Sequence, residues 1–193
     1  YRGPSEALEA PLPLKEGSRI VTGHDSKAFV FFPNAGQVYV EKNSSLTVGK
    51  ARQKGPKGRV HYELSLENGT VYSRFDRLGD GSIFHYATPF GSARVLGTDF
   101  LLNVQKNSGA TVEVLKGFVG VDAQGKEELS QRVGKGERAL IQAGSDGQLL
   151  ITELSPDEES RLSRQFEHAF GGMTIKKTKS FEGDLQIVMR REG

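Results

Sequence analysis

Residues 59–67 read Arg-Val-His-Tyr-Glu-Leu-Ser-Leu-Glu, and this stretch decides the fold class. Apolar and polar side chains alternate along it, and the apolar ones are Val60, Tyr62, Leu64 and Leu66. A period of two is the pattern of a β-strand with one buried and one solvated face. The pair Asn68-Gly69 follows directly, and because both residues tolerate positive φ, we predict that the strand ends there in a hairpin turn.

The same signal continues along the chain on both sides of this strand. A period of two recurs in Phe100–Gln105 and in Thr111–Val114. Glycine makes up 24 of the 193 residues, well above the roughly 7% of an average protein. From Leu14 to about Leu154 the glycines are spread at short intervals, with β-branched or aromatic stretches between them. This spacing predicts an all-β fold in which many short antiparallel strands form a β-sandwich or a β-solenoid-like body.

The pattern changes to that of a helix at Ser155. A serine suited to the N-cap is followed by Pro156 at the first helical position and by Glu158 three residues after the cap. An apolar face then recurs at helical spacing, and it consists of Leu162, Phe166, Ala169 and Phe170. We predict one amphipathic helix, Pro156–Phe170, packed on the sheet. One or two further strands are expected around Met173–Lys177 and Leu185–Arg190.

The sequence suggests three segments. Residues 1–13 contain three prolines and few apolar groups, which is typical of an extended leader or linker. Residues 14–154 are expected to form the β domain, and residues 155–193 the helix with the strands packed on it. The chain begins with Tyr1 rather than Met. We interpret it as a processed or trimmed fragment that a signal peptide or a membrane helix could have preceded.

Charge and cysteine content exclude several classes of function. Lys and Arg total 26 against 24 Asp and Glu, a formal net charge of +2, so nucleic acid is not an expected partner. The chain has no cysteine, which excludes disulfides, thiolate metal sites and cysteine nucleophiles. The longest apolar run, Ala28–Phe32, is far shorter than the roughly 20 residues that span a bilayer. Membrane contact is therefore expected only through a segment absent from this fragment.

Motifs for catalysis or metal binding are missing from the sequence. The histidines lack the spacing of metal ligands, and they are His24, His61, His85 and His168. Neither a phosphate-binding loop nor a Gly-x-Ser-x-Gly elbow is present. We therefore expect no metal, no cofactor and no enzyme activity. The alternative that stays open is a glycosidase that uses paired carboxylic acids, with the candidates Asp76, Asp80 and Asp99.

A basic segment is the candidate anion-binding patch. It carries five cations and no acid between residues 50 and 59, and they are Lys50, Arg52, Lys54, Lys57 and Arg59. One interpretation is a solvated surface loop, and the other is a patch for an anionic glycan, a lipid headgroup or a nucleic acid. No aromatic side chain lies among the cations, so stacking of nucleic-acid bases has no platform.

Five short sequence motifs occur in order along the chain. They are Leu14–Gly23 with Gly-x-x-Ile-x-Thr-Gly, Ala87–Pro89 with Thr-Pro, Ala93–Phe100 with Gly-Thr-x-Phe, Val112–Val121 with Val-x-Val-x-x-Gly-x-Val-x-Val, and Val133–Glu137 with a closing Gly-Glu turn. Together, and in this order, these motifs resemble those of the FecR domain family, and the resemblance extends over about residues 14–143.

The residues that carry the resemblance suit structural roles. Thr88-Pro89 ends a strand because proline has no N–H for the ladder. Gly97-Thr98 permits a sharp turn or bulge before Phe100 re-enters the core, and Gly117 reverses the chain between two Val-rich strands. None of these groups is a nucleophile, an acid or a metal ligand. The full set of motif residues is Gly17, Thr22, Gly23, Thr88, Pro89, Gly97, Thr98, Phe100 and Gly117.

The resemblance also implies a location and a kind of function. It implies an all-β module in the periplasm or at the cell surface of a bacterial envelope. In regulatory members of the family, a cytoplasmic segment holds a sigma factor and the periplasmic domain receives a signal from an outer-membrane receptor. We therefore expect a non-catalytic module for signal sensing or protein–protein relay, with a receptor or another envelope component as its partner. Exposed sheet edges would be its docking surface. The alternative is a stand-alone secreted envelope protein with a scaffold or glycan-binding role.

Overall fold

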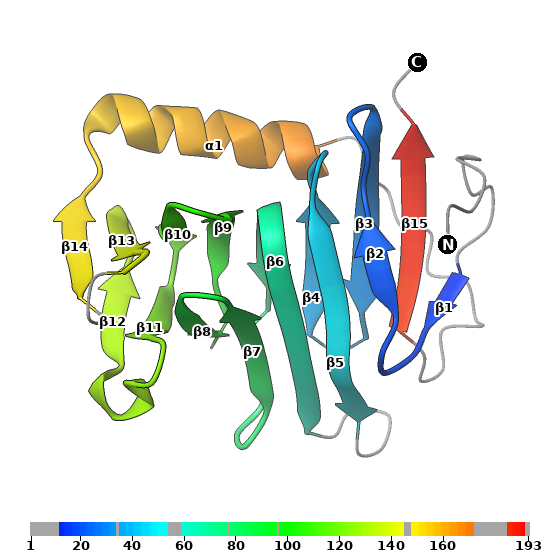
Figure 1. Ribbon diagram of the computed structural model, residues 1–193. Helices are drawn as coiled ribbons and strands as arrows, with labels where there is room; N and C mark the ends of the chain where they lie inside the picture. Colours follow the sequence, from blue (N-terminus) through cyan, green and yellow to red (C-terminus); the bar gives the residue numbers. More distant parts are fainter. Residues whose placement is uncertain are drawn as a thin grey trace.

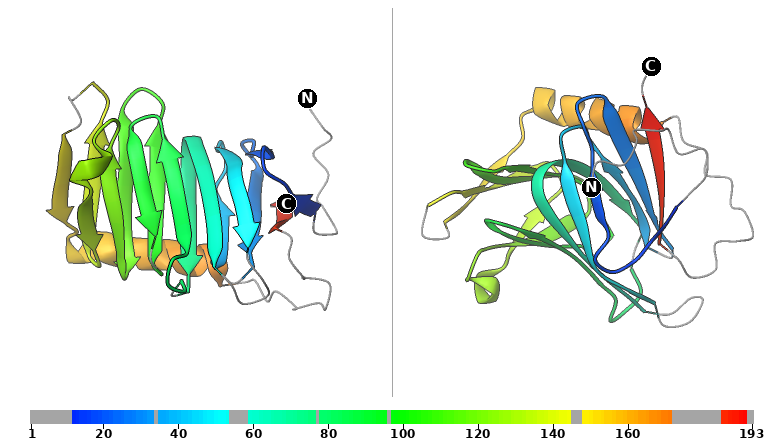
Figure 2. Two further views of the ribbon diagram at one scale, coloured as in Figure 1. Left: turned by 90° about the horizontal axis from the view of Figure 1, so that it is seen from below. Right: turned by 45° about the vertical axis from the view of Figure 1, so that its right-hand side comes forward.

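A computed structural model gives the structure of residues 12–33, 35–53, 59–76, 78–95, 97–144, 148–171 and 185–191. Two β-sheets face each other and share one long strand, and helix α1 (Pro156–Phe170) lies across the outer face of one of them (Figure 1). The right-hand view of Figure 2 shows the two sheets as separate layers, with the helix on one side only. The prediction of an all-β fold with one C-terminal amphipathic helix is confirmed.

Sheet A is the sheet that carries the helix. In spatial order its strands are β1 (Leu12–Leu14), β15 (Leu185–Arg191), β3 (Ser26–Phe32), β4 (Gly36–Val40), β6 (Val60–Phe75), β9 (Asp99–Gln105), β10 (Gly109–Lys116), β13 (Glu137–Gln142) and β14 (Leu149–Glu153). Each of these strands is antiparallel to its neighbours.

The first and the last of the described strands pair at one edge of sheet A. The predicted leader comprised residues 1–13, but Leu12 and Pro13 belong to β1, which pairs with β15. The predicted strand around Leu185–Arg190 is present as β15. The other predicted strand, Met173–Lys177, lies outside the described residues.

Sheet B is the second layer. In spatial order its strands are β2 (Arg19–Val21), β5 (Ser45–Gln53), β6, β7 (Ile83–Thr88), β8 (Gly91–Val95), β11 (Phe118–Ala123) and β12 (Gln131–Gly134), and the 3-10 helix η1 (Glu127–Leu129) connects the last two. β6 and β7 run parallel, which the sequence did not indicate, whereas the other described pairs are antiparallel.

Strand β6 belongs to both sheets because it does not end where the sequence predicted. Its first part pairs with β5 and β7 in sheet B, and its second part pairs with β4 and β9 in sheet A. The hairpin predicted at Asn68-Gly69 is therefore wrong. Gly69 has a φ of +102°, and a Cβ added there would collide with Ser44. The glycine lets the strand bend from one layer into the other without reversing it.

Aromatic side chains from both sheets pack between the layers. The Phe32 ring of sheet A lies 5.1 Å from the Tyr62 ring of sheet B, measured between centroids. Phe75 and Phe84 are 4.0 Å apart by the same measure. The alternating apolar residues of the opening stretch all point into this core, and Leu66 is 0% exposed. The period of two thus identified the buried face of β6 correctly.

A second, smaller core fixes helix α1 on the outer face of sheet A. Leu162, Phe166, Ala169 and Phe170 are buried, as predicted, and they pack on Phe29, Tyr39, Tyr72 and Leu101. Burial of a large apolar side chain contributes roughly 1.5–3 kcal/mol. The capping box predicted at the start of the helix is present between Ser155 and Glu158.

Candidate functional site

Three motif residues meet where β9 begins beside the turn between β10 and β11. The Thr98 hydroxyl donates a hydrogen bond to the Phe118 carbonyl at 2.7 Å, and the Thr98 carbonyl accepts one from the N–H of Phe75 at 3.2 Å. Gly117 has a φ of +79°, and a Cβ added there would lie 2.7 Å from the carbonyl oxygen of Gly97. The polar groups of this cluster therefore bond to backbone.

Replacing Thr98 with valine tests how much this hydroxyl stabilises the fold. Thr98 is 1% exposed, so the change keeps the volume but leaves the Phe118 carbonyl without its donor. We expect the free energy of unfolding in urea to fall by about 1–2 kcal/mol. Thr47→Val is the matched control, because Thr47 is a half-buried strand residue of sheet B. Equal stability of the two variants would contradict this role of the hydroxyl.

The first motif connects the end of β2 to the turn between β4 and β5. Thr22 is buried, and its hydroxyl donates to the Glu41 carbonyl at 2.6 Å and accepts from the Ser44 N–H at 2.9 Å. The carbonyl of Gly23 accepts a hydrogen bond from the N–H of Asn43 at 3.1 Å. This motif also joins two backbone segments.

The remaining motif residues lie in turns or in the core. Gly17 donates its N–H to the Val48 carbonyl at 2.7 Å. The Thr88 hydroxyl donates to the carbonyl of Gly91 at 2.8 Å and accepts from its N–H at 3.1 Å, and Pro89 lies inside the turn so formed. Phe100 is fully buried between the sheets. The motif residues thus occupy several separate places in the fold and do not converge on one cleft.

Two cations of the predicted anion-binding patch are paired with carboxylates. Lys50 contacts Glu63 at 2.7 Å, and this hydrogen bond is the main reason why the pKa of Glu63 is lowered. Arg52 contacts Glu16 at 3.2 Å. The pKa of Glu16 is lowered mainly by the N–H of Ala51 and then by Arg52. Arg59 is exposed. Lys54 and Lys57 lie outside the described residues.

The aspartates considered for glycoside hydrolysis have different surroundings. Asp76 and Asp80 are exposed, the second in a turn closed by a hydrogen bond from the Ser82 N–H to the Gly79 carbonyl. Asp99 contacts Arg74 at 3.3 Å, yet burial raises the pKa of the Asp99 carboxyl against the effect of that arginine. Within the described ranges, no three His, Asp or Glu side chains gather in a group that could hold a metal ion.

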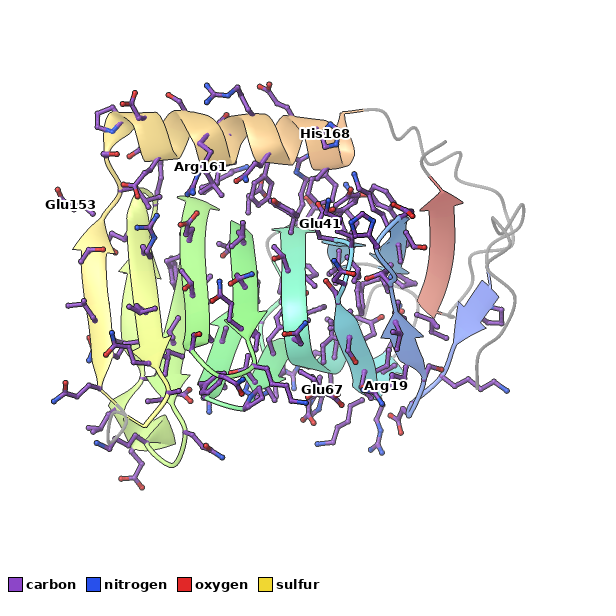
Figure 3. The ribbon with its side chains drawn as sticks, turned by 45° about the horizontal axis from the view of Figure 1, so that its top comes forward. Arg19, Glu41, Glu67, Glu153, Arg161 and His168 are labelled. Atoms are coloured by element: carbon purple, nitrogen blue, oxygen red, sulfur yellow. The ribbon has the colours of Figure 1, made fainter. Side chains whose placement is uncertain are left out.

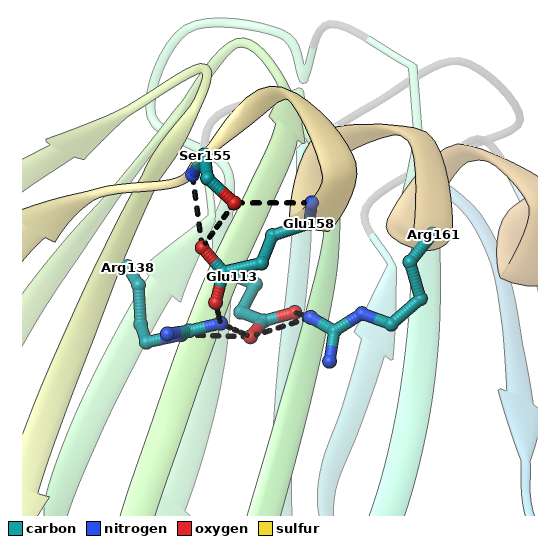
Figure 4. A network of polar contacts seen from close by, with 5 residues as sticks. All are labelled: Glu113, Arg138, Ser155, Glu158 and Arg161. Atoms are coloured by element: carbon teal, nitrogen blue, oxygen red, sulfur yellow. Dashed lines mark hydrogen bonds and ion pairs between the residues drawn. The ribbon is translucent and has the colours of Figure 1, made fainter.

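A network of charged side chains beneath the helix was not predicted. Figure 4 shows Glu113 of β10 between Arg138 of β13 and Arg161 of α1. Arg138 Nε donates to Glu113 Oε1 at 2.8 Å, and Arg161 Nη2 donates to Glu113 Oε2 at 2.8 Å. Arg138 also contacts Glu158 at 2.8 Å, which continues the network to the helix N-cap at Ser155. These contacts connect two strands of sheet A to the helix.

No pattern of neighbouring residues indicates this network. Glu113 alternates with Val112 and Val114, which is the pattern of a solvated strand position, yet it is 5% exposed. Arg138 of β13 and Arg161 of α1, both distant from Glu113 in the sequence, bond to its carboxylate.

The network predicts a loss of stability in acid. The pKa of Glu158 is lowered from 4.5 to about 2, first by the N–H of Ser155, then by Arg138 and the Ser155 hydroxyl. Because the folded pKa lies below the unfolded one, this stabilisation is complete above about pH 4.5 and is lost as the pH falls toward 2. We expect Glu158→Gln to remove part of the slope of unfolding free energy against pH in this window, measured by urea unfolding. Glu159→Gln, which removes a neighbouring charge but no capping contact, is the control, and the same change in both variants would contradict the assignment.

The sheet edges are the remaining surfaces of interest. Among the described strands, β1 and β14 end sheet A, and β2 and β12 end sheet B. β14 is the longest of these edge strands with five residues, and its Leu150 is 57% exposed. Figure 1 shows β14 at the end of sheet A, below the start of α1, and Figure 3 shows Glu153 at this outer edge.

Comparisons with known proteins identify the fold and the family. Two crystal structures of a provisionally assigned anti-sigma factor from Parabacteroides distasonis are similar to this chain, each with a TM-score of 0.59 and with 17% and 18% sequence identity. The matches cover 74% and 78% of this chain but 62% and 65% of those chains, so the chain spans less than two thirds of their length. No curated protein gives a significant match.

In the part of the chain that the structure describes, no helix has the length and apolarity needed to cross a membrane.

Comparison of the sequence with family models shows the family of this chain. The family model described as FecR protein matches residues 18–120, more than half of the 193 residues. The matched region contains the cluster of Gly97, Thr98 and Gly117 and most of both sheets. The chain therefore belongs to the FecR family.

Proposed function

We propose that this chain is a non-catalytic protein-binding module that acts outside the cytoplasm and relays contact with another protein to the control of a sigma factor. The observation that carries this proposal is membership of the FecR family over residues 18–120. The likeness to the Parabacteroides distasonis structures supports it, because that protein is provisionally assigned as an anti-sigma factor and shares the fold.

The geometry of the motif residues supports a binding role over a catalytic one. The hydroxyls of Thr22, Thr88 and Thr98 bond to backbone groups, and Gly117 lies against the backbone of Gly97. Side chains that bond to the backbone in this way stabilise the shape of the domain. Recognition of a partner then depends on other groups, which are exposed at the surface. A receptor or another envelope component is the expected partner.

Transcription in the host that carries this protein tests the regulatory role. Deleting residues 18–171 from the full-length protein should change the transcript level of sigma-dependent genes at least fivefold. Restoring the intact full-length protein should reverse the change. Unaltered transcripts across all sigma-dependent genes would overturn the role in sigma-factor control.

A reporter fusion tests the location. Alkaline phosphatase, which becomes active only outside the cytoplasm, is fused after Gly193 of the full-length protein. We expect an active fusion. A fusion that is made in normal amount but stays inactive, while a cytoplasmic reporter at the same position is active, would overturn the proposed location.

A further inference from the structure

We infer that β14 is the docking edge of the module, where an extended segment of a partner protein with basic residues at its amino-terminal end adds to sheet A as an antiparallel strand. This inference rests on the proposed function as a protein-binding module, and it adds the place, the direction and the charge of the partner segment.

The first argument is the hydrogen bonding of β14. The N–H of Leu154 donates to the Gly136 carbonyl at 2.7 Å, so that residue faces β13. Backbone groups in an antiparallel ladder alternate in direction, so Leu150 and Thr152 also face β13. The N–H and C=O groups of Ile151 and Glu153 then face away from it. Among the described strands β14 pairs with β13 alone, so these groups are available to another strand.

The second argument is that the other edges are less suited to strand addition. β1 and β2 have three residues each, and Pro13 in β1 lacks an N–H. β12 has four residues and includes Arg132, a charge of the kind that discourages edge pairing. β14 has five residues, contains no proline, carries its one charged residue, Glu153, at its last position, and exposes Leu150 to solvent. It is therefore the edge with the fewest features that prevent pairing.

The charge around β14 indicates the chemistry of the partner. Glu153 ends the strand, and Asp157 and Glu159 lie in the first turn of α1, which begins three residues later. All three residues are exposed, and none has an ion-pair partner among the described residues. In antiparallel addition, the amino-terminal end of the new strand lies beside the carboxyl-terminal end of β14. Lysine or arginine at that end of the partner would complement these acids.

The same argument disfavours a second copy of this chain as the occupant. If two copies paired through β14, the amino-terminal end of one strand would meet Glu153 of the other. The residues that precede Leu149 in the sequence are Ser145, Asp146, Gly147 and Gln148, which include an acid and no cation. A partner of different sequence therefore fits the edge better.

Amide hydrogen exchange measured by NMR tests the inference on the isotope-labelled chain. The probe is a seven-residue capped peptide of alternating valine and threonine with two lysines at its amino-terminal end. The control peptide has the same composition with the lysines at the carboxyl-terminal end. In the free protein we expect the amides of Ile151 and Glu153 to exchange at least tenfold faster than those of Leu150 and Thr152. The first peptide should slow the exchange of Ile151 and Glu153 at least fivefold more than the control peptide.

A charge variant and a concentration series complete the test. Glu153→Lys should remove the preference for the first peptide. The inference is overturned if neither peptide slows exchange, or if both peptides slow it equally in the unaltered protein. It is also overturned if these amides become protected at higher protein concentration without peptide, which would identify a second copy as the occupant. Transcription of sigma-dependent genes is a separate readout, so failure here would leave the proposed function standing.

Discussion

Replacing Phe166 with aspartate is expected to lower the free energy of unfolding by about 4 kcal/mol or more. The Phe166 side chain is 1% exposed between helix α1 and sheet A, and its ring lies 5.4 Å from that of Tyr72. The change removes a large apolar group and brings a carboxylate into the same space. Thermal and urea unfolding, followed by circular dichroism, measure the loss.

The control for this variant introduces the same residue on the exposed side of the helix. Arg164→Asp places an aspartate two residues earlier, at an exposed position. We expect it to cost under about 1 kcal/mol, the difference in helix propensity together with a change in surface charge. If both variants unfolded at the same urea concentration, the packing of this helix face on sheet A would be contradicted.

Replacing Gly117 with alanine is expected to destabilise the fold by about 3 kcal/mol. Two costs combine at this motif residue. Its φ of +79° is unfavourable for any residue with a Cβ, and the new Cβ would lie 2.7 Å from the carbonyl oxygen of Gly97. Backbone cannot move aside as a flexible side chain can, so the turn between β10 and β11 must shift. Urea unfolding at neutral pH measures the change.

Gly125 offers a control that separates these two costs. It has a similar φ of +73°, but a Cβ added there meets nothing within 4 Å. Gly125→Ala should therefore show the backbone strain alone, about 1 kcal/mol. A loss of the same size in both variants would mean that the close approach to Gly97 is unimportant.

Features encoded by neighbouring residues could be predicted from the sequence. The alternation in residues 59–67 identified the buried face of β6, because side-chain direction in a strand depends only on the period of two. The serine, proline and glutamate at the start of α1 identified its first turn, and the apolar spacing identified its buried face. In each case the signal lies within a few residues of the structure that it specifies.

Features that depend on distant parts of the chain could not be predicted in this way. Asn68-Gly69 has the composition of a hairpin turn, and only the pairing of β6 with β4 and β9 shows that the strand continues. Glu113 has the pattern of a solvated residue until α1 covers it. The parallel pairing of β6 and β7 has no local signature either.

The candidate site was predictable to a similar extent. The motif residues could be read as backbone-shaping from their types alone, and the contacts of Thr98 and Gly117 have the geometry that such a role needs. The carboxylates opposite Lys50 and Arg52 were not foreseen, because Glu63 and Glu16 reach those cations from other segments of the chain. The choice among the sheet edges also required the strand order.

The sharing of β6 by both layers makes the body indivisible. A cut between Asn68 and Gly69 would place the partners of the strand pairs β4–β6 and β6–β7 on different fragments. It would also separate the Phe32 ring from the rings of Phe75 and Phe84, which it contacts between the layers. Neither piece would then have a complete inner surface of its own to bury. Fragments produced by protease at that bond should therefore remain unfolded when separated and regain structure when mixed.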